Sequence, residues 1–451
     1  MDIIAAIATA DALSAIGIVR VSGEGCFALC DQVFQPAGGG LFSAVRAREM
    51  TLGRLLDREG NAIDSCLAVR FPGPGSYTGE DCAEFHCHGS PVVLREALES
   101  LFAAGARQAG RGEFTKRAFL NGCMDLSQAE AVIDLIESET AQAARNAVEQ
   151  LGGALRRKIE PVYDGLLEIA SRFYAVVDYP DEDIEELGRE EMERTLTEAE
   201  GTLSSLLATA GRGRVLRQGV PAAILGKPNA GKSSLLNALV GYDRAIVTDV
   251  AGTTRDTVEE KAVLGGVLLR LIDTAGIREA GDAVERLGVE RSRQAAERAE
   301  LALLVLDGSR PVSEEDRAAA EAAGLAPRVI VLRNKCDLPR RLDWTPELGP
   351  VLDVSAREGT GLDALEDAVA EMFPEGGASA GEILTNVRQE EAVSRALEAV
   401  RGAREALCGA LTPDAVLSDA ERAMHALGEI TGRTLREDLT ARIFERFCVG
   451  K

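Results

Sequence analysis

Residues 226–233 read Gly226-Lys227-Pro228-Asn229-Ala230-Gly231-Lys232-Ser233, which matches the phosphate-binding loop pattern G-x-x-x-x-G-K-[ST]. An apolar run, 220–225, precedes the loop and an amphipathic run, 235–240, follows it, so the sequence predicts a strand, a glycine-rich turn and a helix. The turn directs backbone N–H groups at phosphate oxygens, and the helix N-terminus adds a positive dipole. We expect Lys232 to reach the outer phosphates and Ser233 to ligate Mg²⁺. The stretch therefore predicts an α/β domain that binds a nucleoside triphosphate.

The base is indicated by residues 334–337, Asn334-Lys335-Cys336-Asp337, which follow a second apolar run, 329–332. A carboxylate at Asp337 can accept hydrogen bonds from both N1–H and the exocyclic amine of guanine. Adenine lacks that donor pair and would leave a buried carboxylate unsatisfied. Alone, N-K-x-D could equally be a polar turn at the end of a strand, but downstream of a phosphate loop it indicates guanine. Residues 355–357, Ser-Ala-Arg, lie where a loop behind the base would fall.

Two further motifs lie between these. Asp273 ends the apolar run 267–272 and begins Asp-Thr-Ala-Gly, so it can hold Mg²⁺ through water while the Gly276 N–H meets the γ-phosphate. Thr254 lies in a polar loop, 252–256, at the position of a first switch, where its hydroxyl can bind the same ion. The order of these motifs predicts a GTPase domain related to the translation factors. The residues expected to contact GTP are Asn229, Ala230, Gly231, Lys232, Ser233, Ser234, Thr248, Asp249, Val250, Ala251, Gly252, Thr253, Thr254, Asp273, Thr274, Ala275, Gly276, Asn334, Lys335, Cys336, Asp337, Ser355, Ala356 and Arg357.

One absence shapes the expected mechanism. Many small GTPases carry a Gln directly after D-x-x-G to orient the attacking water, and here that position is Ile277. Asn229, with the carbonyls of 248–254, could instead cage a monovalent cation that neutralises charge between the β- and γ-phosphates. Glu285 is a candidate to position water. The alternative for Glu285 is a solvated helix carboxylate, and spacing alone favours that alternative.

Composition bounds the rest of the chain. Its 451 residues suggest about three domains, and no run of eighteen apolar residues predicts a membrane span. The N-terminus lacks the basic region of a secretory signal, and nine scattered cysteines suggest reduced thiols in the cytoplasm. The formal net charge of −23, from 73 acidic and 50 basic residues, argues against indiscriminate adhesion to polyanions. An RNA substrate would require a local basic patch or a partner.

The patterns along the chain predict four segments. Residues 1–118 alternate strand-like and loop-like runs and predict a mixed α+β domain. Residues 119–214 are rich in Ala, Glu and Leu at helical spacing. The GTPase domain occupies 215–374, and a second helical block follows at 375–451. The simplest geometry folds the two helical blocks together with the GTPase domain inserted between them, so that switch motion reaches the host.

Two clusters allow alternative interpretations. Cys448, three residues from the last residue and near Lys451, could be an exposed, low-pKa nucleophile, although a small buried hydrophobe is the commoner fate of cysteine. Residues 82–88 offer four possible zinc ligands on one face of a strand. A half-buried strand that ends at Gly89 is the favoured interpretation, because no second pair at zinc-finger spacing exists. The possible ligands are Cys82, Glu84, His86 and His88.

The motifs together resemble the MnmE (TrmE) family of tRNA-modification GTPases over the whole chain. The resemblance rests on G-I-V-R at 17–20, F-P-G-P-x-S-Y-T-G-E-D at 71–81, G-E-F-x-x-R-A-F-L-N at 112–121, the GTPase motifs, and the terminal F-C-V-G-K. Other phosphate-loop GTPases carry neither the N-terminal blocks nor the last five residues. The family implies a folate-binding N-terminal dimerisation domain, a helical domain formed from two segments, and an inserted GTPase domain with a parallel sheet flanked by helices.

The resemblance also implies site residues. Family members are activated by potassium-dependent dimerisation of their GTPase domains, which assigns K⁺ to Asn229, Thr248, Val250 and Thr253. It assigns Mg²⁺ to Ser233 and Thr254, and hydrolysis to Glu285, and it makes a functional role for Cys448 the expectation. The implied folate site comprises Arg20, Glu84, Cys123 and Lys451. Cys123 stands where the family usually has Lys, and the loop 10–15 departs from the family's glycine- and proline-rich turn.

The implied activity is that of a cytoplasmic, homodimeric GTPase. With an FAD-dependent MnmG (GidA) partner, in an expected heterotetramer, it installs an aminomethyl or carboxymethylaminomethyl group at C5 of the wobble uridine of certain tRNAs. A reduced folate, 5-formyl- or methylene-tetrahydrofolate, donates the one-carbon unit. Two alternatives stay open at this point. One is a switch GTPase for ribosome or RNA assembly without modification chemistry, and the other is a folate-dependent one-carbon enzyme with a regulatory GTPase domain.

Overall fold

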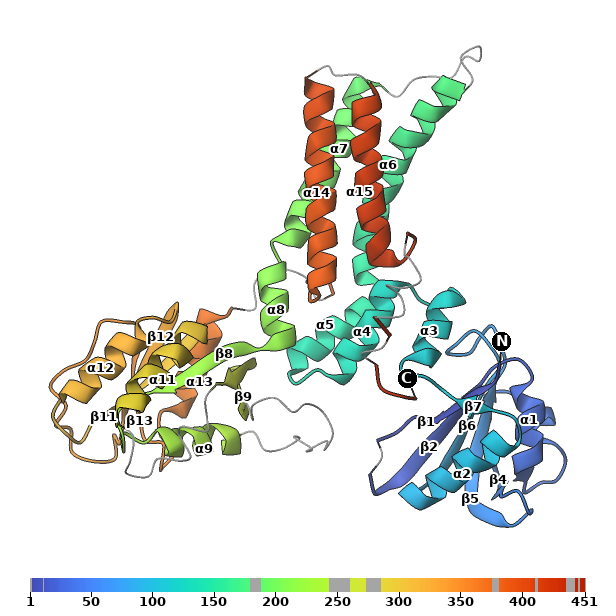
Figure 1. Cartoon of the computed structure of the whole chain (residues 1–451), viewed down its shortest axis with the longest axis horizontal. Helices are drawn as coiled ribbons and strands as arrows, with labels where there is room; N and C mark the ends of the chain where they lie inside the picture. Colours follow the sequence, from blue (N-terminus) through green and yellow to red (C-terminus); the bar gives the residue numbers. More distant parts are fainter. Residues whose placement is uncertain are drawn as a thin grey trace. The chain divides into compact units, whose positions relative to one another are not determined.

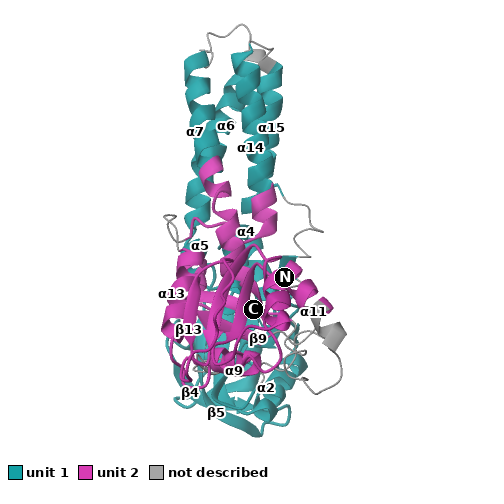
Figure 2. Cartoon of the chain, turned by 90° about the vertical axis from the view of Figure 1, so that its left-hand side faces the viewer, with its two compact units in different colours: residues 1–136, 148–203, 392–451 teal, residues 137–147, 204–391 magenta. Residues whose placement is uncertain are grey.

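The computed structural model describes residues 2–10, 12–178, 188–242, 260–272, 285–374, 381–409, 413–434, 443–444 and 447–450, without the side chains of 176–178, 241–242, 285–289, 291 and 413. The chain divides into two compact units (Figure 2). One unit comprises Met1–Ile136, Val148–Leu203 and Ala392–Lys451, and the other comprises Glu137–Ala147 and Ser204–Glu391. No helix of the described ranges is long and apolar enough to cross a bilayer.

The N-terminal part of the first unit is a seven-stranded sheet in the order β3-β4-β5-β6-β2-β1-β7. Its strands are β1 Ile4–Ile7, β2 Ser14–Ser22, β3 Phe34–Pro36, β4 Thr51–Leu56, β5 Ala62–Phe71, β6 Cys82–Gly89 and β7 Arg107–Gln108. Its helices are α1 Cys26–Val33, α2 Pro91–Ala103 and α3 Glu113–Leu120, with a 3₁₀ turn at Phe42–Ala44. Phe34, Phe42 and Phe85 pack against one another with ring centroids 5.5–5.9 Å apart and form the centre of this core. The predicted strand ending at Gly89 is confirmed.

The same unit holds helices from two distant segments of the chain that lie side by side (Figure 1). Before the second sheet come α4 Leu126–Ile136, α6 Ala154–Asp178 and α7 Arg189–Leu207, and after it come α14 Val387–Cys408 and α15 Pro413–Thr431. Two other helices of the intervening segment, α5 Ala141–Leu151 for most of its length and α8 Ala210–Gln218, belong to the second unit. Glu200 of α7 accepts hydrogen bonds from Arg401, at 2.9 Å, and from Arg404 of α14. Glu160 of α6 pairs with Arg433, just after α15, at 2.8 Å. The expected helical domain formed from two segments is therefore confirmed.

The second unit is built on a six-stranded sheet in the order β13-β12-β11-β8-β10-β9. Its strands are β8 Val220–Leu225, β9 Glu260–Leu264, β10 Val267–Leu271, β11 Leu301–Asp307, β12 Arg328–Asn334 and β13 Val351–Val354. Its helices are α9 Lys232–Tyr242, α11 Glu285–Arg298, α12 Glu314–Ala323 and α13 Leu362–Met372. All pairs are parallel except β9 with β10, so the expected parallel sheet carries one antiparallel edge strand.

The strand order of the second unit places its ligand site. From β8 the chain continues to β10 on one side of β8, and then crosses to β11 on the other side. Open α/β sheets bind ligands outside the carboxyl ends of the strands at such a reversal. Every residue of β11 is buried, as expected for a central parallel strand covered by helices on both faces. The loops after β8, β11 and β12 therefore meet at one edge of the sheet.

Candidate functional site

The phosphate-binding loop connects β8 to α9 in a backbone conformation that requires glycine. Gly231 has φ 104°, and a Cβ there would lie 2.0 Å from Asn334 Nδ2. Asn229 adopts φ 60° and its side chain is exposed. The loop is thus pressed against the end of β12, and any side chain at Gly231 would separate the two. Ser233 and Ser234 follow in the exposed first turn of α9.

Lys232 folds back over this loop. Its Nζ donates to the carbonyl oxygens of Gly226, at 2.7 Å, and Lys227, at 2.9 Å. Burial lowers the pKa of Lys232 below its ordinary value. Among the residues that the structure describes, the Lys232 ammonium has no anionic partner, and phosphate oxygens would supply one. The loop therefore has the donors and the charge to hold a polyphosphate.

Asn334, the last residue of β12, joins three loops through one buried amide. Its Nδ2 donates to Ala230 O of the phosphate loop at 2.9 Å, and its Oδ1 accepts from Ala356 N at 3.0 Å. Only 3% of Asn334 is exposed. Because both ends of the amide are used, the phosphate loop and the 355–357 loop are held in fixed positions relative to residues 334–337.

Lys335 supports the phosphate loop from the other side. Its backbone has φ 65°, and its Nζ donates to Asn229 O at 3.0 Å and to Asp307 Oδ2 at 2.6 Å. Burial alone would raise the pKa of Asp307, but hydrogen bonds from Lys335 and Ser309 outweigh it, and the pKa lies below its ordinary value. Asp307 is therefore an ionised, buried carboxylate that holds the Lys335 ammonium on the loop.

Asp337, the expected base-reading carboxylate, is held by a single described hydrogen bond. Ser355 Oγ donates to Asp337 Oδ1 at 2.7 Å, and Ser355 is buried, so it fixes the carboxylate from behind. Asp337 is exposed in this structure, whereas the sequence argument treated it as buried. Arg357 is also exposed. An open cavity of about 210 Å³ adjoins the motif and is lined in part by Asn334, Lys335 and Cys336.

Several predicted site residues lie outside the described residues. These are 248–254 and 273–276, which carry the expected switch threonines and Asp273, and Lys451 of the expected folate site. Glu285 is the first residue of α11, but the structure does not describe its side chain. Its role in hydrolysis stays a prediction.

Three of the four residues predicted for the folate site are described, and two of them are in contact. Arg20 and Glu84 stand opposite each other on β2 and β6, and Arg20 Nε lies 2.8 Å from Glu84 Oε1. The Arg20 guanidinium also lies over the rings of Tyr77, at 5.3 Å, and Phe114, at 5.6 Å. A ligand carboxylate at Arg20 would therefore compete with Glu84. Cys123 is exposed.

Cys448 is exposed, so the interpretation of this cysteine as a small buried hydrophobe is wrong. The backbone around it is held to the N-terminal part of its own unit. Gly112 N donates to Cys448 O at 3.2 Å, and Arg111 and Val449 form an isolated antiparallel bridge. The backbone on either side of the exposed thiol is therefore held in place, as a reactive cysteine requires.

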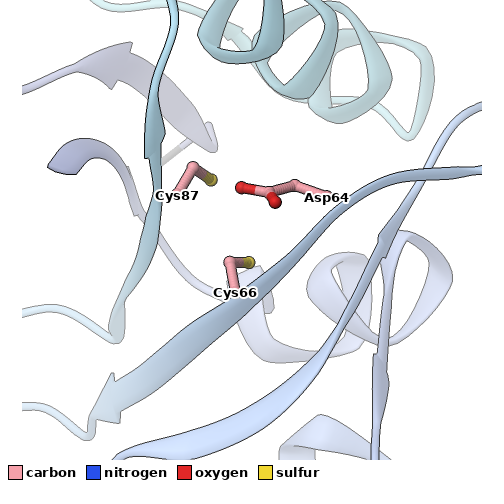
Figure 3. A group of neighbouring side chains, drawn as sticks. All are labelled: Asp64, Cys66 and Cys87. Carbon is pink, nitrogen blue, oxygen red and sulfur yellow. The ribbon is translucent and has the colours of Figure 1, made fainter. Parts of the chain in front are cut away.

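The four zinc ligands considered at 82–88 do not form a group of potential ligands among the described residues. A different trio, Asp64, Cys66 and Cys87, has ligand atoms within 4.8 Å of one another (Figure 3). Asp64 is already occupied, because its Oδ2 accepts from His88 N at 2.8 Å and its Oδ1 lies 2.7 Å from His88 Nδ1. A hydrogen bond with Cys66, together with burial, raises the pKa of Cys87 and opposes a metal-binding thiolate. We interpret the trio as a core cluster beneath an Asp–His pair.

Sequence reasoning missed Asp307. A signal for it existed, since Asp307 ends the apolar strand β11 in the same way that Asn334 ends β12. The strands are parallel neighbours with Asp307 opposite Asn334, so both ends reach the phosphate loop. Only the pairing of the strands shows that these two positions belong to one site.

Two family models match the chain: the MnmE helical domain over residues 126–448 and the GTP-binding protein TrmE N-terminus over residues 3–123. Proteins named tRNA modification GTPase MnmE are similar over the full length. That of Alkaliphilus oremlandii (strain OhILAs) is 43% identical, and that of Roseiflexus sp. (strain RS-1) is 44% identical, each covering 100% of this chain and 99% of the relative. A solved bacterial selenocysteine-specific elongation factor EF-Sec overlaps 35% of this chain and 29% of its own at 18% identity with a TM-score of 0.25, too low to bear on fold or function.

Replacement of Asp307 by Asn should weaken the hold of the phosphate loop on its ligand. The amide keeps the shape but leaves the Lys335 ammonium without a counter-charge, so we expect the Kd for GDP to rise roughly tenfold. Equilibrium titration with a fluorescent GDP analogue measures this. Glu300→Gln, which removes a charge just before the other end of β11, should bind as the unmodified protein does. Equal affinities for Asp307→Asn and Glu300→Gln would contradict the role of Asp307.

Proposed function

The chain belongs to the MnmE family of tRNA modification GTPases, and on that premise we propose that it hydrolyses GTP in the course of modifying the wobble uridine of tRNA. The observation that supports guanine as the base is the position of the Asp337 carboxylate. Ser355 Oγ donates a hydrogen bond to it at 2.7 Å, and Asp337 lies just after β12, the strand that ends at Asn334. A carboxylate fixed there matches the N1–H and amine edge of guanine and rejects adenine. Lys232 and the loop N–H groups hold the phosphates.

Asp337→Asn should change the preferred base from guanine to xanthine. The carboxylate accepts two hydrogen bonds from guanine, whereas an amide donates one and matches the C2 carbonyl of xanthine. We expect the rate of GTP hydrolysis to fall by roughly a hundredfold or more and the rate of XTP hydrolysis to rise, because a site that forms hydrogen bonds with one base strongly rejects a base that cannot form them. Turnover of GTP, XTP and ATP measured side by side checks this. An unchanged preference for GTP would remove Asp337 from base recognition.

For hydrolysis we propose that two copies of the chain bring their GTPase domains together around a K⁺ ion. Asn229 supports this, because its carbonyl oxygen accepts a hydrogen bond from Lys335 while Asn229 itself is exposed within the phosphate loop. Asn229, Thr248, Val250 and Thr253 would hold K⁺, which supplies positive charge between the β- and γ-phosphates. Ser233 and Thr254 would hold Mg²⁺, and Ser233 fits, since its exposed position at the start of α9 is where an Mg²⁺-binding hydroxyl is needed. Glu285 would orient water, in place of the Gln that Ile277 replaces.

GTP hydrolysis should be much faster in potassium than in sodium at the same ionic strength. Removal of the Asn229 amide, in Asn229→Ala, should abolish the difference between the salts because the amide oxygen is the proposed ligand. Phosphate release in each salt, with sedimentation under transition-state-mimic conditions to record dimerisation, provides the measurement. Equal rates in both salts for the unmodified protein would contradict the cation role.

We further propose that the N-terminal domain binds a reduced folate, 5-formyl- or methylene-tetrahydrofolate, that donates the one-carbon unit. Arg20, Glu84, Cys123 and Lys451 are the proposed contacts. The Arg20–Glu84 pair fits such a ligand only in part, because Arg20 must give up or share its contact with Glu84 to bind a ligand carboxylate.

We propose that an FAD-dependent MnmG-type protein assembles with the homodimer as a heterotetramer. We propose also that the exposed Cys448 takes part in the modification chemistry, and that the protein is cytoplasmic.

Deletion of the gene should remove the aminomethyl or carboxymethylaminomethyl group from C5 of the wobble uridine in the affected tRNAs. Mass analysis of nucleosides from total tRNA, with and without a plasmid copy of the gene, tests the whole proposal. Loss of the modified nucleoside that the plasmid restores is expected. Unchanged nucleosides would instead favour a switch GTPase for RNA assembly.

A further inference from the structure

The phosphate loop has a buried ion pair that the motifs described above do not account for. Lys227, the second residue of the loop, extends its Nζ to Asp316 Oδ2 of α12 at 2.7 Å and to Ser313 Oγ at 3.3 Å. The side chains of Lys227 and Asp316 are 10% and 1% exposed. Because both charges are removed from water, each depends on the other, and loss of either partner leaves a buried unpaired charge.

Asp316 also caps its own helix, but capping does not account for its charge. Its Oδ2 accepts from Ser313 N at 2.9 Å and from Ser313 Oγ at 2.8 Å, which completes a capping box at the start of α12. Its Oδ1 is buried, with no hydrogen-bond partner among the described residues. An Asn or a Ser could serve as the cap. In the described part of the chain, Lys227 is the one basic side chain that forms an ion pair with Asp316.

Lys227 connects this pair to the residue that contacts the phosphates. Its carbonyl oxygen accepts from Lys232 Nζ at 2.9 Å and from Ala230 N at 3.3 Å, so the backbone of Lys227 sets both the turn of the loop and the resting position of the Lys232 ammonium. The Lys227 side chain is fixed by Asp316, which belongs to a helix and cannot follow movements of the loop. Asp316 thereby holds the loop through Lys227, and Lys335 holds it through the carbonyl oxygen of Asn229.

We propose that Asp316 is a positioning residue of the GTPase site, which acts through Lys227 to preorganise the phosphate loop for a guanine nucleotide. The inference rests on the proposed function. Neither residue is among those proposed to contact the base or the transferred phosphoryl group, so we expect the pair to stabilise the bound ground state and the transition state equally. Its loss therefore weakens binding and leaves the turnover number nearly unchanged.

A double-mutant cycle on the full-length chain tests this, with Kd for N-methylanthraniloyl-GDP and kcat for GTP as readouts. Asp316→Asn keeps the capping acceptor and loses the charge, and we expect its Kd to rise roughly tenfold with kcat within about twofold of the unmodified protein. Lys227→Met should show the same split. The double variant should bind no more weakly than Lys227→Met alone, because the two residues act through one contact. Glu315→Gln, an exposed carboxylate in the same first turn of α12, is the matched control and should bind normally.

Normal nucleotide affinity in Asp316→Asn would overturn the inference. So would a double variant whose rise in Kd is the product of the two single rises, because Asp316 and Lys227 would then act independently and Asp316 would be only a helix cap. If Asp316→Asn does not fold, Lys227→Met and Lys227→Arg decide. Arg keeps the ion pair and should bind within about threefold of the unmodified protein, whereas Met should lose roughly tenfold. Equal binding by the two variants overturns the inference. If the unmodified protein binds no guanine nucleotide, the proposed function fails first, and independently of Asp316.

Discussion

The side-chain amide of Asn334 is the interaction on which the candidate site depends. It lies at the end of a central strand, almost fully buried, and forms hydrogen bonds both to the phosphate loop and to the loop 355–357. A buried amide with both ends satisfied is rigid, and loss of either partner would leave a polar group unpaired in a medium of low dielectric. The loops after β8, β12 and β13 are therefore arranged before any ligand arrives.

Around this amide, the phosphate loop is held by charges from outside itself. Asp307 and Asp316 stand at the end of β11 and the start of α12, and each neutralises a lysine that is tied to the loop backbone. Phosphate binding needs positive charge, yet lysines close together repel one another and cost free energy when buried. Carboxylates placed behind Lys227 and Lys335 relieve that cost and leave Lys232, whose pKa is lowered by burial, as the cation that a phosphate would satisfy.

The first unit depends on different physics. A sheet with an aromatic core carries Arg20 and Glu84 on neighbouring strands, and helices from two distant segments are joined by ion pairs such as Glu160 with Arg433. Most of these pairs are partly exposed, so they select which helices meet more than they stabilise the unit. The apolar stripes of the helices supply most of the packing energy.

The sequence by itself determined the strand–loop–helix around Lys232, the strands before Asn334 and up to Gly89, and the helical character of the two blocks that flank the GTPase domain, because each has a local signature in glycine, charge or periodicity. It did not reveal Asp307, whose partner Lys335 is distant along the chain, nor that Arg20 and Glu84 face each other, nor that Asp64 and His88 rather than a zinc set organise the end of β6. These contacts arise from strand pairing, and register is decided by the packing of whole sheets. Local spacing reports which chemistry a residue can offer, and only the tertiary structure decides which residues stand close enough to use it.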